Sequence, residues 1–353
     1  MEEEEKGKAK KEEEKATAPG QNRTFGTEER SADVGARFGL LGKVSFRTAR
    51  FYLIGVCVIM FALAPVITRN SYYLGTLSTI ALYGVLAMSW DILSGYTGYL
   101  NFGIAFSFGV GGYAAALVGV HTALPPSMGI FLGGLASVLF GFIVGAPSLR
   151  LRGHFFILVT LLVPLATAAL LQVLLVDGSI FGVNQIVTNQ AYTYEASVAV
   201  FALTGVVLYV VSNSNIGLIF RAIRENEIAA EASGIHTGSY KILAFSISGF
   251  FAGMAGALYV YANGVASPTM FGILLSAPPV FMAALGGMGT IAGPILGAFL
   301  LEGSLDFFRI NIISDARLLI AAVLLFVVLL FFPEGIWGAV SSWGQRRRRH
   351  KKS

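Results

Sequence analysis

FRAIRENEIAAEASGI, residues 220–235, is a polar and helix-favouring segment between two long apolar segments, and it determines how the rest of the chain is interpreted. Ser214 or Asn215 can cap its start. Gly234 can adopt the left-handed conformation that ends a helix. We interpret the segment as a docking element that a membrane protein presents to a soluble partner. The alternative is a solvated loop helix without a partner.

The composition places most of the chain in a lipid bilayer. Hydrophobic residues make up 55% of the chain and charged residues 13%, and the mean hydropathy of +0.70 lies outside the range of soluble domains. Of the 45 charged side chains, 21 lie in residues 1–50 and six in residues 346–352, which leaves too few for an aqueous surface between them. The ending RRRRHKK is explained by the positive-inside rule or by anionic lipid, and we expect no nucleic acid partner.

Cysteine and histidine give no sign of a metal centre or of catalysis. Cys57 is the single cysteine, which excludes a disulfide within the chain and a metal site built on several cysteines. The four histidines are dispersed, and none has the spacing of a metal-binding pair. We therefore expect neither catalytic residues nor a bound metal.

The two ends of the chain are charged tails. Residues 1–38 have mixed charge and no apolar periodicity, which is typical of a disordered segment and not of a signal peptide. Basic residues between positions 43 and 50 precede the first apolar run, so the positive-inside rule predicts a cytoplasmic N-terminus. The predicted organisation is a disordered cytoplasmic tail at 1–38, a transmembrane domain at 39–340 and a basic cytoplasmic tail at 341–353.

Apolar segments of about 20 residues predict an all-α polytopic membrane protein. The chain must reverse near Gly286, Gly287 and Gly289, because a single span over 274–301 would deliver the basic C-terminal tail to the outside. The alternative to ten crossings is that the glycine-rich segment 99–120 re-enters without crossing. We expect about ten segments, at 51–67, 72–92, 99–120, 127–147, 154–176, 195–212, 240–262, 274–287, 291–305 and 317–332.

Glycine is the second compositional signal. Pairs four residues apart, such as Gly249 and Gly253, have the spacing that lets two helices pack closely. Clusters over 95–112 and 286–293 would break helices, which a membrane tolerates only where the break is buried in protein or lines a watery cavity. We predict pathway walls there, while each nearby polar side chain could equally satisfy a freed backbone group. The candidate pathway residues are Ser94, Thr97, Asn101, Asn263, Gly286 and Gly287.

The predicted spans lack the carboxylate relay that a proton- or sodium-driven carrier uses. Asp91, Glu302 and Asp306 lie near span ends, and Asp91 is better explained as an interfacial residue or a packing partner. The sequence also has no G-x-x-x-x-G-K-[ST] phosphate loop. If ATP drives this protein, a separate polypeptide must hydrolyse it.

Five stretches in a fixed order carry a family resemblance. They are LSGYTGYLNFGIAFSFGVGGYAAAL from Leu93, LRLRGHFFILVTL from Leu149, RAIRENEIAAEASGIHTGSYKILAFSISGFFAGMAGALY from Arg221, SPTMFGILLSAPPVFMAALGGMGTIAGPILGAFLLE from Ser267 and LFFPEGIWG from Leu330. Together they resemble the permease subunits of branched-chain amino-acid ABC importers, in the LivM-like branch. The resemblance covers about residues 70–340.

The resemblance implies a type II importer-like permease in a prokaryotic plasma (inner) membrane. Its partners would be a second, LivH-like permease chain, two cytoplasmic ATPase subunits that bind ATP and magnesium, an external solute-binding protein, and membrane lipid. This chain would bind no cofactor and would not be an enzyme. The segment at about 217–235 would be the coupling helix that sits in a groove of the ATPase. Its coupling residues would be Arg221, Arg224, Glu225, Glu227, Ala229, Ala230 and Gly234.

The chain departs from the family pattern at two places that bear on the substrate. It carries Tyr99, Asn101 and Ile104 where the family commonly has a Gln, Ser and His pattern, and its external motif is weakened to DGSIFGVNQI from Asp177. Branched-chain or other apolar amino acids are the expected substrates, with urea or short amides as the alternative. A secondary transporter or channel is a further alternative that would not need the docking helix.

Overall fold

The computed structural model describes residues 55, 61, 71–122, 124–151, 153–174, 190–311, 323, 326, 330 and 335–338, all within one compact unit, Arg50–Ser353. The predicted tails lie outside these residues, as do most of the first and last predicted spans. The cytoplasmic placement of both termini therefore stays a prediction.

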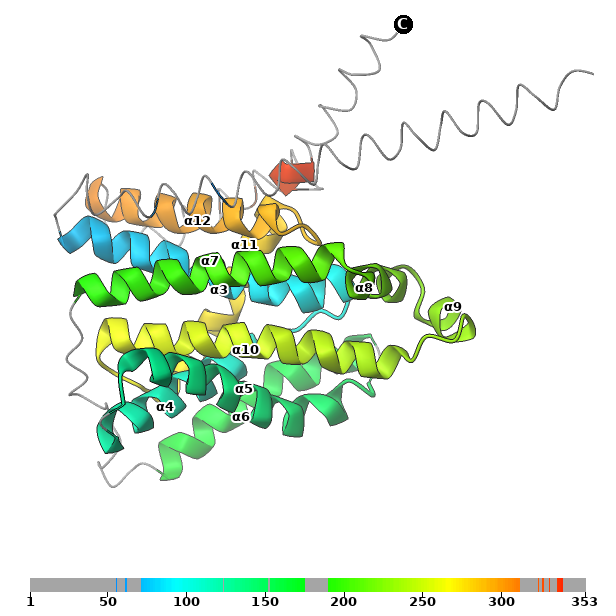
Figure 1. The fold of residues 1–353 in the computed structure, drawn as a ribbon, viewed down its shortest axis with the longest axis horizontal. Helices are drawn as coiled ribbons and strands as arrows, with labels where there is room; N and C mark the ends of the chain where they lie inside the picture. Colours follow the sequence, from blue (N-terminus) through cyan, green and yellow to red (C-terminus); the bar gives the residue numbers. More distant parts are fainter. Residues whose placement is uncertain are drawn as a thin grey trace, which may run out of the picture. The chain divides into compact units, whose positions relative to one another are not determined.

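Every regular element in the described residues is a helix (Figure 1). The order is α3 (Ser71–Thr97), α4 (Ile104–His121), α5 (Pro126–Ser148), α6 (His154–Leu174), α7 (Gln190–Asn213), α8 (Asn215–Glu225), α9 (Glu227–Ala232), α10 (Thr237–Asn263), the 3₁₀ helix η1 (Pro268–Phe271), α11 (Ile273–Gly286) and α12 (Ala292–Asn311). The predicted all-α class is confirmed.

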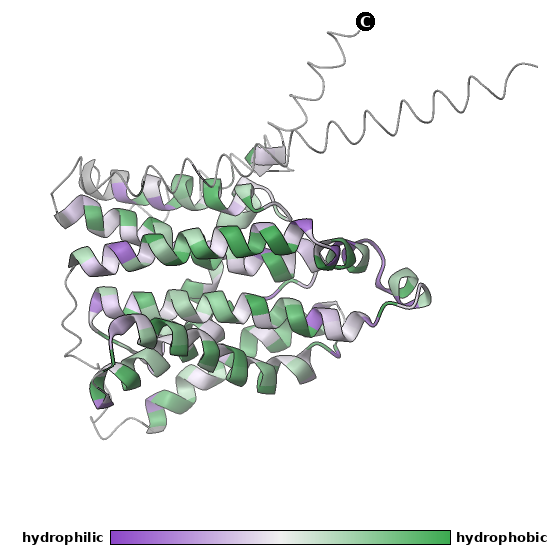
Figure 2. Cartoon of the chain, in the orientation of Figure 1, coloured by the Kyte–Doolittle hydropathy of each residue, from purple (hydrophilic) through white to green (hydrophobic). Residues whose placement is uncertain are grey.

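Six of the described helices, α3 to α7 and α10, are long and apolar enough to cross a membrane. Figure 2 shows apolar residues along their lengths. They correspond to six of the predicted spans and differ from them mainly at the ends. α3 continues to Thr97, α4 begins only at Ile104, and α7 begins already at Gln190. The total number of crossings stays a prediction, because the outer spans lie largely outside the described residues.

The predicted reversal around Gly286 to Gly289 is confirmed. α11 ends at Gly286 and α12 begins at Ala292, and the two helices pack against each other. Gly287 and Gly289 have φ angles of 118° and 75°, which side chains with a Cβ rarely adopt. The turn therefore depends on glycine at these two positions.

α3 and α10 form the centre of the bundle. Of their most apolar 18-residue windows, 78% and 61% of the residues are buried, whereas the corresponding share for α6 is 17%. α10 packs against α3, α4 and α5. α6 thus turns most of its apolar surface outward, toward lipid or another chain.

Glycines allow α4, α5 and α10 to approach closely. A Cβ added at Gly253 would lie 2.4 Å from the Cβ of Ser137, and one added at Gly256 would lie 1.8 Å from the carbonyl oxygen of Phe108. Lipid supplies no hydrophobic drive between helices, so close packing of this kind is the main source of their association.

We expect Gly256→Ala to lower the melting temperature of the purified chain, because its methyl group would overlap the Phe108 carbonyl and overpacking costs about 1–3 kcal/mol. Gly238→Ala on the same helix is the matched control, since nothing lies within 4 Å of its added Cβ. Thermal unfolding in detergent compares the two variants. Equal melting temperatures would contradict the proposed packing constraint.

Candidate functional site

The docking segment consists of two helices, where the sequence predicted one over about 217–235. α8 ends at Glu225 and α9 begins at Glu227. Asn226 between them is extended, with φ −160° and ψ 105°, and its side-chain oxygen accepts a hydrogen bond from the Ala229 amide at 3.1 Å. Asparagine is a preferred N-cap residue. The sequence signal for the second helix was therefore Asn226, which the sequence analysis had placed inside a single helix.

The predicted end of the segment is confirmed, and the predicted cap at its start is not formed by Ser214. Ser214 occupies the N-cap position of α8, but its hydroxyl donates to the Val211 carbonyl at 2.7 Å. Gly234 has a φ of 84°, and the Ile235 amide donates back to the Ala230 carbonyl at 3.1 Å. This is the arrangement in which a left-handed glycine ends a helix.

α8 is anchored in the bundle. Phe220 and Ile223 are 0% and 3% exposed, and α8 packs against α3, α7 and α10. The Arg221 guanidinium donates to the Ser212 carbonyl at 2.7 Å and lies 5.6 Å from the centroid of the Tyr96 ring. Arg221 is therefore directed into the chain, where it fixes α8 to the end of α7 and to α3.

α9 is the exposed part of the docking segment, and it lies beyond the ends of α7 and α10 (Figure 1). Ile228 is 69% exposed, and Ala229 is also exposed, whereas Ala230 is buried against the chain. Of the predicted coupling residues, Arg224, Glu225, Ala229 and Gly234 are exposed. The exposed face of α9 is small, apolar and rimmed by charge.

Arg224 joins α8 to the end of α3 and to the α11–α12 turn. Its Nη1 atom donates to the Gly95 carbonyl near the end of α3 at 2.5 Å. A Cβ added at Gly289 would lie 2.4 Å from the same Nη1 atom, so the α11–α12 turn packs directly on this guanidinium. Asp91 Oδ1 accepts a hydrogen bond from the Gly289 amide at 2.8 Å. Asp91 is thus a packing partner, in agreement with one of the two roles predicted for it.

A partly buried polar network connects α9 with α10 and with the α3–α4 connection. The Lys241 ammonium forms a salt bridge with Glu227 Oε1 at 2.7 Å and donates to the Tyr99 hydroxyl at 3.0 Å. The Tyr99 hydroxyl in turn donates to Glu227 Oε2 at 2.5 Å. The Thr237 hydroxyl donates to Glu231 Oε1 at 2.6 Å. The Lys241 and Glu227 side chains are only 7% and 15% exposed, so this ion pair is largely withdrawn from water.

Tyr99 is held by more than its hydroxyl. Its ring packs edge-on against Phe156 with centroids 5.3 Å apart, and the Lys241 ammonium lies 4.7 Å from its centroid. Burial, together with the hydrogen bond to the Glu227 carboxylate, raises the pKa of Tyr99. The hydroxyl therefore keeps its proton and acts as a hydrogen-bond donor to Glu227.

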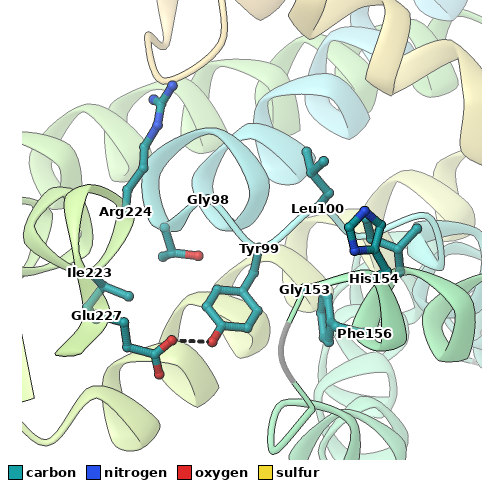
Figure 3. Close-up of a pocket in the computed structure, with 11 residues that line it drawn as sticks. Gly98, Tyr99, Leu100, Gly153, His154, Phe156, Ile223, Arg224 and Glu227 are labelled. Atoms are coloured by element: carbon teal, nitrogen blue, oxygen red, sulfur yellow. Dashed lines mark hydrogen bonds between the residues drawn. The ribbon is translucent and has the colours of Figure 1, made fainter.

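A cavity of about 310 Å³ lies beside this network (Figure 3). Tyr99 and Leu100 border it from the α3–α4 connection, His154 and Phe156 from the start of α6, and Ile223 from α8. The cavity is therefore bordered by the segments on which the docking helices rest.

The predicted pathway residues of the first glycine cluster satisfy backbone groups at the end of α3. The Ser94 hydroxyl accepts a hydrogen bond from the Asn101 amide at 3.0 Å, and the Thr97 hydroxyl donates to the Leu93 carbonyl at 2.6 Å. The Asn101 side chain accepts a hydrogen bond from the Gly103 amide at 2.8 Å. The structure thus brings Ser94, Thr97 and Asn101 together, in the backbone-satisfying arrangement that the sequence analysis kept as an alternative.

The other predicted pathway residues lie elsewhere. Asn263 is the last residue of α10, and its side chain donates to the Tyr259 carbonyl at 2.9 Å. Gly286 and Gly287 lie in the α11–α12 turn, where an added Cβ at Gly286 would lie 1.7 Å from the Gly293 carbonyl oxygen. A role of any of the six residues in solute passage stays a prediction.

Sequence reasoning missed the polar network. In the sequence, only the departure from a family pattern marks Tyr99, and Lys241 lies inside a predicted apolar span. The available signal was a lysine one position inside a predicted span, with Glu227 on the preceding polar segment. A charge at such a position requires a partner, and Glu227, to which the sequence analysis gave a coupling role, is a carboxylate that can serve as one.

The comparisons with known proteins point to one family. The model of a family described as branched-chain amino acid transport system / permease component matches residues 72–332. The LivM permease protein of Salmonella typhimurium is 28% identical over 330 residues, which cover 81% of this chain and 74% of the relative. Its Escherichia coli counterpart is 27% identical with the same coverage. The BraD permease protein of Pseudomonas aeruginosa is 26% identical over 289 residues, or 72% of this chain and 91% of the relative. No solved structure gives a significant match.

We expect Asn226→Ala to loosen α9, because loss of an N-cap costs about 1 kcal/mol, or roughly fivefold in a local opening equilibrium. Hydrogen exchange of the α9 amides should accelerate by about that factor. Asn263→Ala, which removes an asparagine side chain at a helix end far from α9, is the control and should leave these amides unchanged. Unaltered exchange in Asn226→Ala would show that the cap does not hold α9.

Proposed function

The chain belongs to the family of permease components of branched-chain amino acid transport systems, and on this basis we propose that it forms the membrane pathway of an ATP-driven importer. The proposed substrates are branched-chain or other apolar amino acids, as the printed names of the relatives suggest, with urea or short amides as the alternative. A second, LivH-like permease chain would complete the pathway, and an external solute-binding protein would deliver the substrate.

The observation that carries the proposal is that the exposed helix α9 follows α8, which is anchored in the bundle. A helix whose apolar Ile228 side chain is 69% exposed leaves surface that a partner protein can cover. Ala229 beside it allows close approach, and Glu225 can fix the register of a partner. Two separate ATPase subunits, which would bind ATP and magnesium, are the proposed partners at this surface.

The anchoring of α8 makes α9 suitable for transmitting force. Because Phe220 is buried and Arg224 is bonded to the Gly95 carbonyl, a displacement of α9 cannot be absorbed by free rotation of α8. Movement would pass to the end of α3 and to the α11–α12 turn, which packs on the same guanidinium. ATP-driven movement of α9 would therefore reach both the end of α3 and the α11–α12 turn.

The proposed orientation places α8 and α9 in the cytoplasm. Arg221 and Arg224 lie on α8, and Arg150 lies in the connection from α5 to α6, where Leu149 contacts the Lys241 ammonium of the same network. Basic residues concentrate on the cytoplasmic side of membrane proteins. A prokaryotic plasma membrane, with the docking segment facing the ATPases inside, is the corresponding location.

Uptake of labelled leucine should depend on this chain and on ATP. We expect uptake in cells that carry the chain to continue after an uncoupler when ATP is maintained, and to stop when ATP is depleted. Cells without the chain are the control, and excess urea tests the alternative substrate class by competition. Uptake that collapses with the proton gradient at high ATP would contradict the proposal and would identify an ion-coupled carrier.

We expect Gly234→Val to reduce ATP-dependent uptake about tenfold while membrane insertion is unchanged, because a β-branched residue at this φ of 84° costs about 1–3 kcal/mol. No atom lies within 4 Å of the added Cβ, so the effect is conformational and not a clash. Gly234→Asn is the matched variant and should retain uptake, since asparagine adopts the left-handed region more readily. Equal uptake by both variants would exclude a role for the helix exit.

A further inference from the structure

We propose that Tyr99, Glu227 and Lys241 are positioning residues that transmit movement of the docking helix α9 to the connection between α3 and α4. The inference rests on the proposed function, because it assumes that α9 moves when a partner ATPase binds and hydrolyses ATP. We name these three residues the latch. Each comes from a different part of the fold: the α3–α4 connection, the first residue of α9 and the first turns of α10.

The latch contains a ring of three contacts, to which the Leu149 carbonyl adds a longer contact with Lys241 at 3.5 Å. Lys241 donates to both Glu227 and the Tyr99 hydroxyl, and that hydroxyl donates to the second oxygen of Glu227. Each residue therefore bonds to both of the others. Movement of any one of the three segments must either carry the other two or break two contacts at once.

Burial makes the latch stiff. With side chains only 7% and 15% exposed, the Lys241 and Glu227 charges have little water available to replace their partners. A buried charge that loses its partner is strongly disfavoured, whereas the intact pair is held by both charge and hydrogen bonds. The low-energy response to a small displacement of α9 is therefore to move Tyr99 along with Glu227.

Tyr99 lies in the short connection between α3 and α4. It follows Gly98, whose φ of 79° turns the chain out of α3 and whose added Cβ would lie 3.2 Å from Arg224 Cγ. It precedes Asn101, which together with Ser94 holds the loop before α4. A displaced Tyr99 would thus alter the angle between α3 and α4.

The cavity of about 310 Å³ supplies room for this displacement. Tyr99 and Glu227 both border it, and Figure 3 shows the Tyr99 ring beside the cavity-lining residues Phe156 and Gly153 with its hydroxyl bonded to Glu227. Close-packed interiors resist side-chain movement, whereas an adjoining cavity lowers that resistance. The latch is therefore stiff within itself and free to move as a unit.

The test uses the complete transporter, purified from its own membrane through a tag on this chain and reconstituted in liposomes with its binding protein and leucine. Tyr99→Phe removes one oxygen atom and retains the ring that packs against Phe156. We expect it to lower the number of leucine molecules imported per ATP hydrolysed at least threefold, while the complex assembles and hydrolysis continues. Tyr73→Phe, at an exposed tyrosine of α3, is the matched control and should retain the ratio.

The ratio separates transmission from a merely structural role. If Tyr99→Phe leaves the number of leucine molecules imported per ATP unchanged, even where import and hydrolysis both fall, the latch is overturned. If the wild-type complex imports no leucine with ATP, the proposed function fails and the latch fails with it. If the wild type imports leucine and Tyr99→Phe does so with the same efficiency, only the latch fails.

A double-mutant cycle asks whether the residues act as one unit. Glu227→Gln should lower the ratio as Tyr99→Phe does, and the double variant should be no worse than the poorer single variant. A double variant whose loss is the product of the single losses would overturn the latch. If Glu227→Gln does not assemble, Glu227→Asp takes its place, because it keeps the charge and shortens the side chain.

Discussion

Backbone groups freed at a helix break must find partners within the protein, because lipid offers none. This constraint explains most of the polar contacts at the end of α3. Ser94, Asn101 and Thr97 bond to nearby backbone groups, and Arg224 reaches from α8 to the Gly95 carbonyl. The docking segment is thus part of what makes the break in α3 tolerable. Its seating on the bundle follows from backbone chemistry before any partner is considered.

The same constraint connects the end of α3 with the α11–α12 turn. Asp91 on α3 accepts a hydrogen bond from the Gly289 amide in the α11–α12 turn, and glycine at 289 leaves space for the Arg224 guanidinium. Asp91 is 1% exposed, and a buried carboxylate is costly if it has no partner. Asp91 of α3 instead accepts a hydrogen bond from the α11–α12 turn, while Arg224 of α8 donates one to the Gly95 carbonyl near the end of α3. The consequence is that the ends of α3 and α11 are joined through polar contacts rather than through apolar packing alone.

The sequence predicted those features that depend on local pattern. Apolar runs predicted six described helices, the glycines at 286–289 predicted the reversal between α11 and α12, and Gly234 predicted the left-handed end of the docking segment. The break at Asn226 was missed, because the surrounding alanines and glutamates favour one continuous helix. The network of Tyr99 and Lys241 was missed because the contacts of Tyr99 join it to residues 128 and 142 positions away in the sequence, and no periodicity links these residues.

The largely buried ion pair connects the exposed helix α9 to the centre of the bundle. Lys241 belongs to α10, a central helix of the bundle, while Glu227 begins the exposed helix α9. Separating them would leave two charges with little water, so the pair resists extension more strongly than the solvent-exposed contacts of α9 do. If α9 is displaced, we therefore expect α10 to be displaced with it before this ion pair breaks. Because Tyr99 is bonded to both charges, the connection between α3 and α4 lies on the path of that displacement.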